Sequence, residues 1–307
     1  MKEKIVPTDI AYTSCLLMSN IEQMIKKYSF LKTGNIGYSV LGKPIPYIRL
    51  GTGNKEVMYA GSFHANEWIT SLLLMKFIEE FCIEYENDGN LYEKNVKKIY
   101  DETSIYIVPM LNPDGVDLVT GAINKNTGIY NQFKDTSLKF KNIPFPNGWK
   151  ANFNGVDLNL QFPAGWNNAR KIKFSQGYTN PAPRDFVGFG PLTEPEALAI
   201  YNFTLIHKFS RILAYHSQGE VIYWQFQNYN PPNSREIGEK LSNASGYALE
   251  ETPYNSSFAG YKDWFIQDYN KPGYTIEVGL GENPLPISQF TKIYNDNIGI
   301  LILSAIL

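Results

Sequence analysis

Four short apolar runs, rich in β-branched and aromatic residues, recur along the chain and limit the folds that it can adopt. They are "EVMYAGSF" (56–63), "SIYIVPML" (104–111), "RILAYHS" (211–217) and "GYTIEVG" (273–279). Near-continuous apolar runs of this length are typical of strands that are buried on both faces, and the stretches between them are long enough to hold helices. The pattern therefore predicts an α/β fold in which helices cover both faces of a parallel or mixed sheet.

Two of the intervening stretches predict helices. The first follows the first apolar run, and its apolar residues share one face: Leu73, Leu74, Phe77, Ile78 and Phe81. The second is "LTEPEALAIYNFTLIHKF", for which we expect Thr193 as the N-cap and Pro195 in the first turn.

The chain is large enough to bury a sizeable core. With 307 residues, of which 43% are hydrophobic, it can form one large α/β domain, and no linker rich in proline, glycine or serine divides it. Residues 120–190 differ, because they are rich in Asn, Gly, Pro and aromatic residues and show little periodicity. So long an irregular stretch is typical of a functional rim. We expect a single domain over residues 1–307.

The charge pattern argues against two classes of partner. The formal net charge is -2 and the lysines are scattered, so the sequence predicts no basic patch that binds nucleic acid. No run approaches the roughly 18 apolar residues that a membrane-spanning helix needs. The sequence does not indicate an oligomeric state.

The N-terminal segment and two cysteines bear on the cellular compartment. Asp9, Asn20 and Glu22 interrupt the apolar residues of that segment, and no small-residue cleavage site follows, so we expect no signal peptide. Cys15 and Cys82 lie in apolar stretches and are expected to be reduced core thiols, with a single disulfide as the alternative. These features together predict a cytoplasmic protein.

The chain has only three histidines, and one of them stands three residues before a glutamate in "HANE". The preceding strand places His64 at the carboxyl edge of the sheet, where open α/β sheets bind ligands, and Glu67 follows one turn later on the same side. Imidazole nitrogen and carboxylate oxygen are zinc ligands, and a catalytic zinc site needs a third. His216 ends a strand before a loop, whereas His207 lies near a helix end, where histidines commonly interact with the helix dipole. His216 is therefore the better third ligand.

A carboxylate inside an apolar strand favours a catalytic interpretation. Glu277 lies between Ile276 and Val278, and burial raises the pKa of a carboxyl group toward the range that suits a general base. Two structural alternatives remain open here. They are a buried, hydrogen-bonded histidine in place of a metal ligand, and a structural salt bridge for Glu277.

Five segments resemble, in the same order, motifs of the zinc carboxypeptidases of the carboxypeptidase A type. They are "GSFHANEWIT" (61–70), "PMLNPDGV" (109–116), "GVDLN" (155–159), "LAYHSQG" (213–219) and "TIEVG" (275–279). The resemblance implies a single α/β domain with a twisted, mixed sheet of about eight strands. It also implies that His64, Glu67 and His216 bind one zinc ion, as two His and one Glu do in such enzymes. Glu277 would then be the general base.

Two positions depart from the family pattern. In "GVDLNLQF", Asn159 matches the family's asparagine, but Leu160 stands where the family has an arginine that grips the carboxylate at a substrate's chain end. In "NGWKAN", Lys150 follows Trp149 where the family has the arginine that polarises the scissile carbonyl, and a lysine still supplies a positive charge there. The resemblance also assigns Tyr254 as the flexible tyrosine that closes over the substrate.

The block around "WKAN" and "GVDLNLQFPAGW", with "YHSQGEVIYW" and "GLGENPLP", resembles most the γ-D-glutamyl-diaminopimelate peptidases, which cut bacterial cell-wall stem peptides. The implied activity is hydrolysis of the γ-D-glutamyl-meso-diaminopimelate bond of stem peptides or muropeptides, reached from the cytoplasm in recycling or spore formation. Relatives often carry LysM wall-binding repeats. None is expected here, because the resemblance begins near residue 30 and fills the chain.

The resemblance also points to a specificity residue. The residue before the Asp-Trp pair of "AGYKDWF" lies, in the family, at the floor of the pocket for the side chain after the cut. Here it is Lys262, which is expected to pair with the distal carboxylate of meso-diaminopimelate, while Asp263 meets the neighbouring amine or braces the lysine. The alternative is that Lys262 extends into solvent.

Three other functions remain open at this point. An ordinary zinc carboxypeptidase would need another cation in place of the missing arginine, and Arg184 and Lys262 are the candidates. A deglutamylase that acts on protein tails has the same requirement. A zinc-bearing module that binds wall peptides without cutting them would need neither Glu277 nor a cation at position 150.

Overall fold

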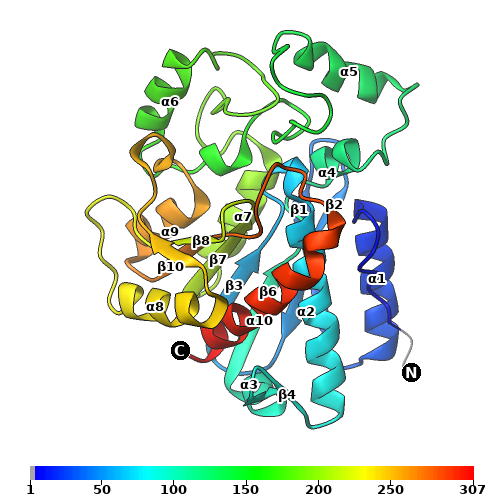
Figure 1. Ribbon diagram of the computed structural model, residues 1–307, viewed down its shortest axis with the longest axis vertical. Coiled ribbons are helices and arrows are strands. Elements are labelled where there is room, and N and C mark those ends of the chain that lie inside the picture. Colours follow the sequence, from blue (N-terminus) through cyan, green and yellow to red (C-terminus); the bar gives the residue numbers. More distant parts are fainter. Residues whose placement is uncertain (1–3) are drawn as a thin grey trace.

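One mixed sheet of eight strands forms the centre of the protein (Figure 1). The computed structural model describes residues 4–307. The strand order in this sheet is β1-β2-β6-β3-β7-β10-β8-β9. The strands are β1 (Lys32–Tyr38), β2 (Pro44–Leu50), β3 (Lys55–Ala60), β6 (Thr103–Val108), β7 (Arg211–His216), β8 (Val221–Tyr223), β9 (Ala248–Glu250) and β10 (Gly273–Glu277), and β4 (Asn90–Leu91) pairs separately with β5 (Lys94–Asn95). The predicted α/β fold with a mixed sheet of this size is confirmed.

The four apolar runs of the sequence form the middle of the sheet. Strands β6, β3, β7 and β10 lie side by side and are parallel, with Ala60 opposite Ala214 and Glu277 opposite His216. Every residue of β6 and β7 is buried, which explains why these strands read as continuous apolar runs. Because the four strands run in one direction, their carboxyl ends lie at one edge of the sheet.

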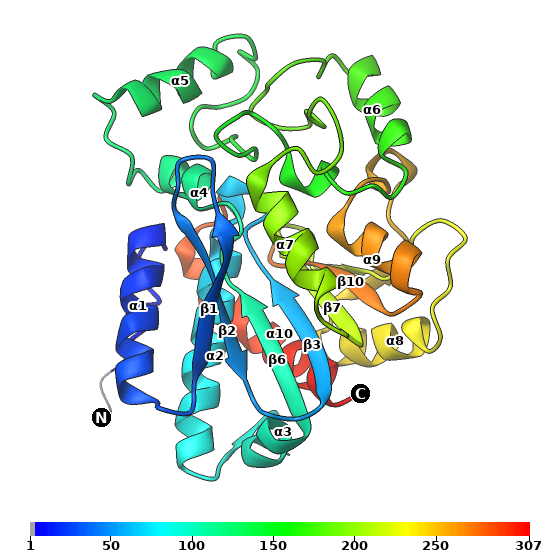
Figure 2. The same cartoon turned by 180° about the vertical axis from the view of Figure 1, so that it is seen from behind.

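Two hydrophobic cores lie on opposite faces of the sheet, and alternate residues of β3 belong to different cores. Val57 and Tyr59 belong to one, and Met58 and Ala60 belong to the other. The helices over the first face are α1 (Ser14–Lys27), α2 (Ile69–Glu86), α3 (Val96–Glu102), α8 (Ser234–Ser245) and α10 (Phe290–Ile306). Those over the second face are α7 (Pro195–Leu205) and α9 (Tyr261–Tyr269), which Figure 2 shows in front of the sheet.

Both predicted helices are present. In α2 the five apolar residues that share one face are all 0% exposed, and burial of side chains of this size stabilises a fold by about 1.5 to 3 kcal/mol each. Helix α7 begins one residue later than predicted. Glu194, rather than Thr193, is its N-cap, and Pro195 occupies the first turn.

The segment from residue 120 to residue 190 stands above the carboxyl edge of the central strands (Figure 1, green). It follows α4 (Pro113–Val119) and holds α5 (Gly128–Ser137), the short 3-10 helix η2 (Leu158–Leu160) and α6 (Trp166–Ser175). The prediction of an irregular rim missed α5 and α6. Each helix has only 10 residues, so its periodicity is hard to distinguish in a stretch rich in asparagine and glycine.

The two cysteines differ in their surroundings. Cys82 is a buried free thiol, as predicted, whereas Cys15 is free but exposed, so the prediction of a core position was wrong for Cys15. Cys15 lies in the first turn of α1, on the face that points to solvent. Within residues 4–307, no helix has the length and apolar character that crossing a membrane requires.

Candidate active site

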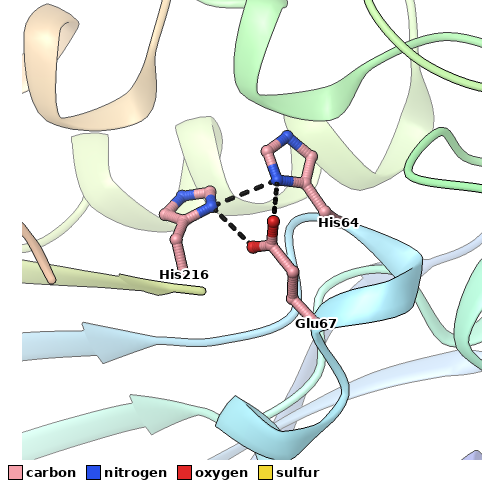
Figure 3. A group of neighbouring side chains, drawn as sticks. All are labelled: His64, Glu67 and His216. Carbon is pink, nitrogen blue, oxygen red and sulfur yellow. Dashed lines mark hydrogen bonds and ion pairs between the residues drawn. The ribbon is translucent and has the colours of Figure 1, made fainter. Parts of the chain in front are cut away.

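Two neighbouring strands bring three ligand-bearing residues together at the carboxyl edge of the sheet (Figure 3). After β3 the chain turns at Ser62, whose φ is 48°. The 3-10 helix η1 (Ala65–Glu67) follows, with His64 as its N-cap and Glu67 as its last residue. His216 is the last residue of β7, the parallel neighbour of β3. The predicted group of His64, Glu67 and His216 is therefore assembled by adjacent strand ends.

The three side chains converge on one point. His64 Nδ1 lies 2.9 Å from Glu67 Oε1, and His216 Nδ1 lies 3.0 Å from Glu67 Oε2. The two Nδ1 atoms are 3.2 Å apart, and the ligand atoms of all three residues lie within 4.8 Å of one another. Figure 3 shows both imidazole rings turned toward the carboxylate between them.

The chemistry of these donors fits a zinc ion. His64 Nε2 lies 3.0 Å from Asp157 Oδ1, so Nε2–H donates a hydrogen bond to that carboxylate, and Nδ1 is the nitrogen that faces Glu67. An unprotonated Nδ1 against a carboxylate is repulsive unless a cation lies between them, so this position is suited to a proton or a metal ion. A carboxylate behind a ligating histidine is a common arrangement in zinc sites, because it fixes the orientation of the ring. His64, Glu67 and His216 would hold the ion.

The pKa values of these side chains also indicate that positive charge is favoured next to Glu67. Burial alone would lower the pKa of His64, but the carboxylates of Glu67 and Asp157 outweigh burial and raise it to about 9. For Glu67, burial acts to raise the pKa, yet His64 and Lys150 hold it well below its ordinary value. The pKa of His216 is lowered, chiefly by burial. Glu67 is thus ionised and available as a ligand.

Glu277 ends β10 and pairs with His216 across the sheet, which places it beside the ligand group. Burial, followed by the charge of Glu67, raises the pKa of Glu277 to about 8, although Lys150 and His64 act in the opposite direction. Its carboxylate has no hydrogen-bond donor among residues 4–307. A free, half-buried carboxylate with this pKa suits a general base.

Lys150 also reaches the site. Its Nζ donates a hydrogen bond to Glu67 Oε1 at 2.8 Å, and its main-chain carbonyl accepts from the N–H of Ala65 at 2.9 Å. Burial lowers the pKa of Lys150, but Glu67 outweighs that effect and raises it. The lysine is therefore a fixed positive charge next to the ligand group.

His207 lies away from this group. It follows the end of α7, and its Nδ1 lies 3.1 Å from Glu56 Oε1. Its ring stacks on that of Phe209, with 4.9 Å between the ring centroids. A local hydrogen bond to Glu56 and aromatic packing, rather than the helix dipole alone, thus account for this histidine.

Two cavities meet at the site. The smaller has a volume of about 230 Å³ and is lined by both histidines of the ligand group. The larger has a volume of about 1100 Å³ and is lined in part by residues of the 120–190 segment. Six residues line both cavities and so surround the passage between them: Lys150, Lys173, Arg184, Asp185, Tyr223 and Glu277. A bound peptide can therefore extend to both sides of the candidate metal centre.

Two charged residues line the smaller cavity side by side. Lys262 and Asp263 line it although each is only 3% exposed. Lys262 Nζ donates to the carbonyl of Gln225 at 2.6 Å and to Thr252 Oγ1 at 3.2 Å, and it lies 2.8 Å from Asp263 Oδ1. The lysine does not extend into solvent, so that alternative is excluded.

Asn159 and Leu160 also line the smaller cavity. Asn159 Oδ1 accepts a hydrogen bond from the N–H of Tyr261 at 3.1 Å, which holds the amide in place and leaves its NH₂ group without a partner among residues 4–307. Leu160 is 8% exposed and packs in the core on the second face of the sheet. The position where the family has an arginine therefore offers no charge.

The structure does not bring Tyr254 to the ligand group. Tyr254 begins the 3-10 helix η3 (Tyr254–Ser256), is 65% exposed, and lines a separate cavity, with its ring against Phe258. Tyr223, which sequence reasoning missed, lines both central cavities instead. It shares a sheet face with Glu277, because the pairing of β8 with β10 sets Tyr223 opposite Thr275. Its phenol pKa is raised by burial and by Glu277, so it remains a donor.

Comparison with known proteins agrees with this site. The sequence profile described as "Zinc carboxypeptidase" matches residues 17–299. The gamma-D-glutamyl-L-diamino acid endopeptidase 1 of Lysinibacillus sphaericus is 43% identical over 291 residues, which cover 95% of this chain and 71% of that protein. The uncharacterized protein YqgT of Bacillus subtilis (strain 168) is 39% identical over 292 residues, which cover 94% and 76%. Carboxypeptidase A from Helicoverpa armigera, 18% identical, shares the fold with a TM-score of 0.72 over 100% of this chain and 77% of that one.

Proposed function

Because the chain belongs to the zinc carboxypeptidase family and is a zinc metallopeptidase, we propose that it hydrolyses the γ-D-glutamyl-meso-diaminopimelate bond of peptidoglycan stem peptides or muropeptides. Similarity to an endopeptidase that is named for γ-D-glutamyl-L-diamino acid bonds supports this substrate. The similarity covers 95% of the chain, and the family profile matches residues 17–299, a range that contains the segment from His64 to Glu277.

The pair of Lys262 and Asp263 in the lining of the smaller cavity carries the substrate proposal. The side chain of meso-diaminopimelate ends in an amine and a carboxylate, which match Asp263 and Lys262. Leu160 offers no charge to a carboxylate at the chain end. The distal carboxylate of the side chain therefore becomes the anionic handle of the substrate.

The residues around the passage have distinct roles in hydrolysis. A bound zinc ion supplies Lewis-acid chemistry, which increases the acidity of water and polarises the scissile carbonyl. Glu277 accepts a proton from the attacking water and later delivers it to the leaving amine. Lys150 stabilises the negative charge that develops on the carbonyl oxygen, and Asp157 keeps the ring of His64 in place. No acyl-enzyme is required.

A defined tetrapeptide tests the proposal. The zinc-loaded protein is incubated with L-Ala-γ-D-Glu-meso-diaminopimelyl-D-Ala, and the products are identified by mass spectrometry. We expect L-Ala-D-Glu and meso-diaminopimelyl-D-Ala, with no products from the Glu277→Gln control. Release of free D-Ala alone would identify an ordinary carboxypeptidase, and binding without any product would identify a module that only binds wall peptides.

We further propose that the substrate is met in the cytoplasm, during muropeptide recycling or spore formation. Two free cysteines, one of them buried, support a reducing compartment. Fractionation of cells that produce the full-length protein tests this location, and recovery of the activity outside the membrane would contradict it.

A further inference from the structure

Arg184 stands beside the catalytic groups with an unused pair of donors. It lines both cavities, and 42% of its side chain is exposed. Its Nε donates to Asp185 Oδ2 at 2.6 Å, whereas its two terminal nitrogens, Nη1 and Nη2, have no partner among residues 4–307. A guanidinium group held through Nε presents its terminal N–H groups as a fork, which is the geometry that binds a carboxylate bidentately.

The main chain fixes Arg184 relative to Lys150. The carbonyl of Pro183 accepts hydrogen bonds from the N–H groups of Lys150 and Ala151, at 2.8 and 2.9 Å. On the other side, the N–H of Asp185 donates to Asp157 Oδ2 at 3.2 Å. Arg184 therefore lies between two anchored residues, although it is 34 positions from Lys150 in the sequence.

Arg184 is also better placed to bind an anion than the two lysines that line both cavities. Lys150 Nζ pairs with Glu67, a metal ligand, and is largely enclosed. Lys173 is 9% exposed and pairs with Asp185 at 2.5 Å, so it braces the residue that holds the guanidinium. Arg184 is more exposed than either of these lysines and has two terminal nitrogens without a partner among residues 4–307.

A γ-linked glutamate presents such a carboxylate next to the scissile bond. In a γ-glutamyl peptide the cut amide is formed by the side-chain carboxyl group, so the α-carboxylate stays free, with three carbon atoms between it and the scissile carbonyl carbon. An α-linked residue with a neutral side chain offers no carboxylate at this distance. An α-linked glutamate offers its side-chain carboxylate there, but its acylated amine lies beside the scissile carbonyl instead of beside the carboxylate. A cation at the passage between the cavities would therefore favour a glutamyl residue before the cut over a residue with a neutral side chain.

We infer that Arg184 binds the free α-carboxylate of the γ-linked D-glutamyl residue and is a specificity-determining residue of this enzyme. The inference rests on the proposed function, because it assigns the D-glutamyl residue of that substrate to the passage lined by Arg184. Lys262 recognises the residue after the cut, and Arg184 recognises the residue before it. The free carboxylate, rather than the D configuration alone, then marks the bond as a substrate.

Amidation of one carboxylate provides the test. Two substrates are compared by kcat/KM: L-Ala-γ-D-Glu-meso-diaminopimelyl-D-Ala and the same peptide with an α-carboxamide on the glutamyl residue, which removes the charge and keeps the size. We expect the wild-type protein to prefer the carboxylate about 10-fold to 100-fold, as for one bidentate, charge-assisted contact. Arg184→Gln should remove that preference by slowing the carboxylate substrate and leaving the carboxamide rate unchanged.

Two variants and one measurement separate binding from other effects. Arg184→Lys, which keeps the charge but not the fork, should retain part of the preference. Arg170→Gln removes a cation that packs over Trp166 and lines neither cavity, so the preference should remain. The zinc content of Arg184→Gln is measured as well, and a normal value excludes damage to the metal site.

The outcomes are distinguishable. Equal wild-type rates on the two substrates, or an Arg184→Gln variant that loses both rates in the same proportion, would overturn the assignment and leave the peptidase intact. A wild-type protein that cuts neither γ-D-glutamyl peptide would remove the proposed function itself and this inference with it.

Discussion

Asp157 is predicted to control how tightly the protein binds zinc. Its Oδ1 accepts the hydrogen bond from His64 Nε2 at 3.0 Å, and because it is a carboxylate this bond is charge-assisted. A hydrogen bond to a charged group contributes about 1.5 to 3 kcal/mol, and each 1.4 kcal/mol changes an affinity tenfold. Asp157→Ala should therefore weaken zinc affinity by about 10-fold to 100-fold, in line with other outer-shell partners of zinc ligands.

The Asn variant divides this effect into two parts. In Asp157→Asn the amide oxygen still accepts from His64 Nε2, but without the negative charge, so the loss should be about half as large in free energy. Zinc affinity is measured by competition with a chromogenic chelator, which needs no substrate and no turnover. Asp268→Asn serves as the control, since it removes a carboxylate that binds Trp264 in α9. Equal zinc affinity in the wild-type protein and both Asp157 variants would refute the argument.

Four further results are expected. His216→Ala should lose the zinc that purifies with the protein, whereas His207→Ala should keep it, as measured by metal analysis. Glu277→Gln should keep zinc and lower kcat by several orders of magnitude, because an amide cannot accept the proton of water. Replacing meso-diaminopimelate by lysine in the substrate should lower kcat/KM about 10-fold to 100-fold, and Lys262→Ala should erase that difference. Burial raises the pKa of Glu196 from 4.5 to about 7, so the free energy of unfolding should fall by about 3 kcal/mol as pH rises between these values. Chemical denaturation of Glu196→Gln at several pH values should show a smaller change in the free energy of unfolding over this range.

The ligand group was predictable because its parts depend on local patterns. His64 and His216 follow apolar runs, and parallel strands bring their carboxyl ends to one edge, so the sequence positions of the strands imply proximity of the histidines. Glu277 was predicted to lie in an apolar strand, and the structure sets it opposite His216. The sheet fixes the position of a residue at the end of a buried strand.

The rim residues were not predictable in this way. The contact between Asp157 and His64 spans 93 positions, and that between Lys150 and Pro183 depends on loops with no periodicity. Asp157 was visible in the "GVDLN" motif, and the general need for a partner behind a ligating histidine would have indicated a carboxylate there. The free donors of Arg184 had no comparable signal, since they depend on which carboxylate its Nε meets.

Three carboxylates at this site face different charges, and this difference assigns their roles. Glu67 and Asp157 lie against His64 and have lowered pKa values, so both stay ionised, one as a ligand and one as the partner of a ligand. Glu277 lies in the same buried region without a hydrogen-bond donor among residues 4–307, and its pKa is raised to about 8. A bound dication would add positive charge close to Glu277 and would lower that pKa, which favours the ionised form that accepts a proton. The neighbours of each carboxylate thus set its pKa, and Glu277, the carboxylate without a hydrogen-bond donor among residues 4–307, is the one that is free to transfer a proton.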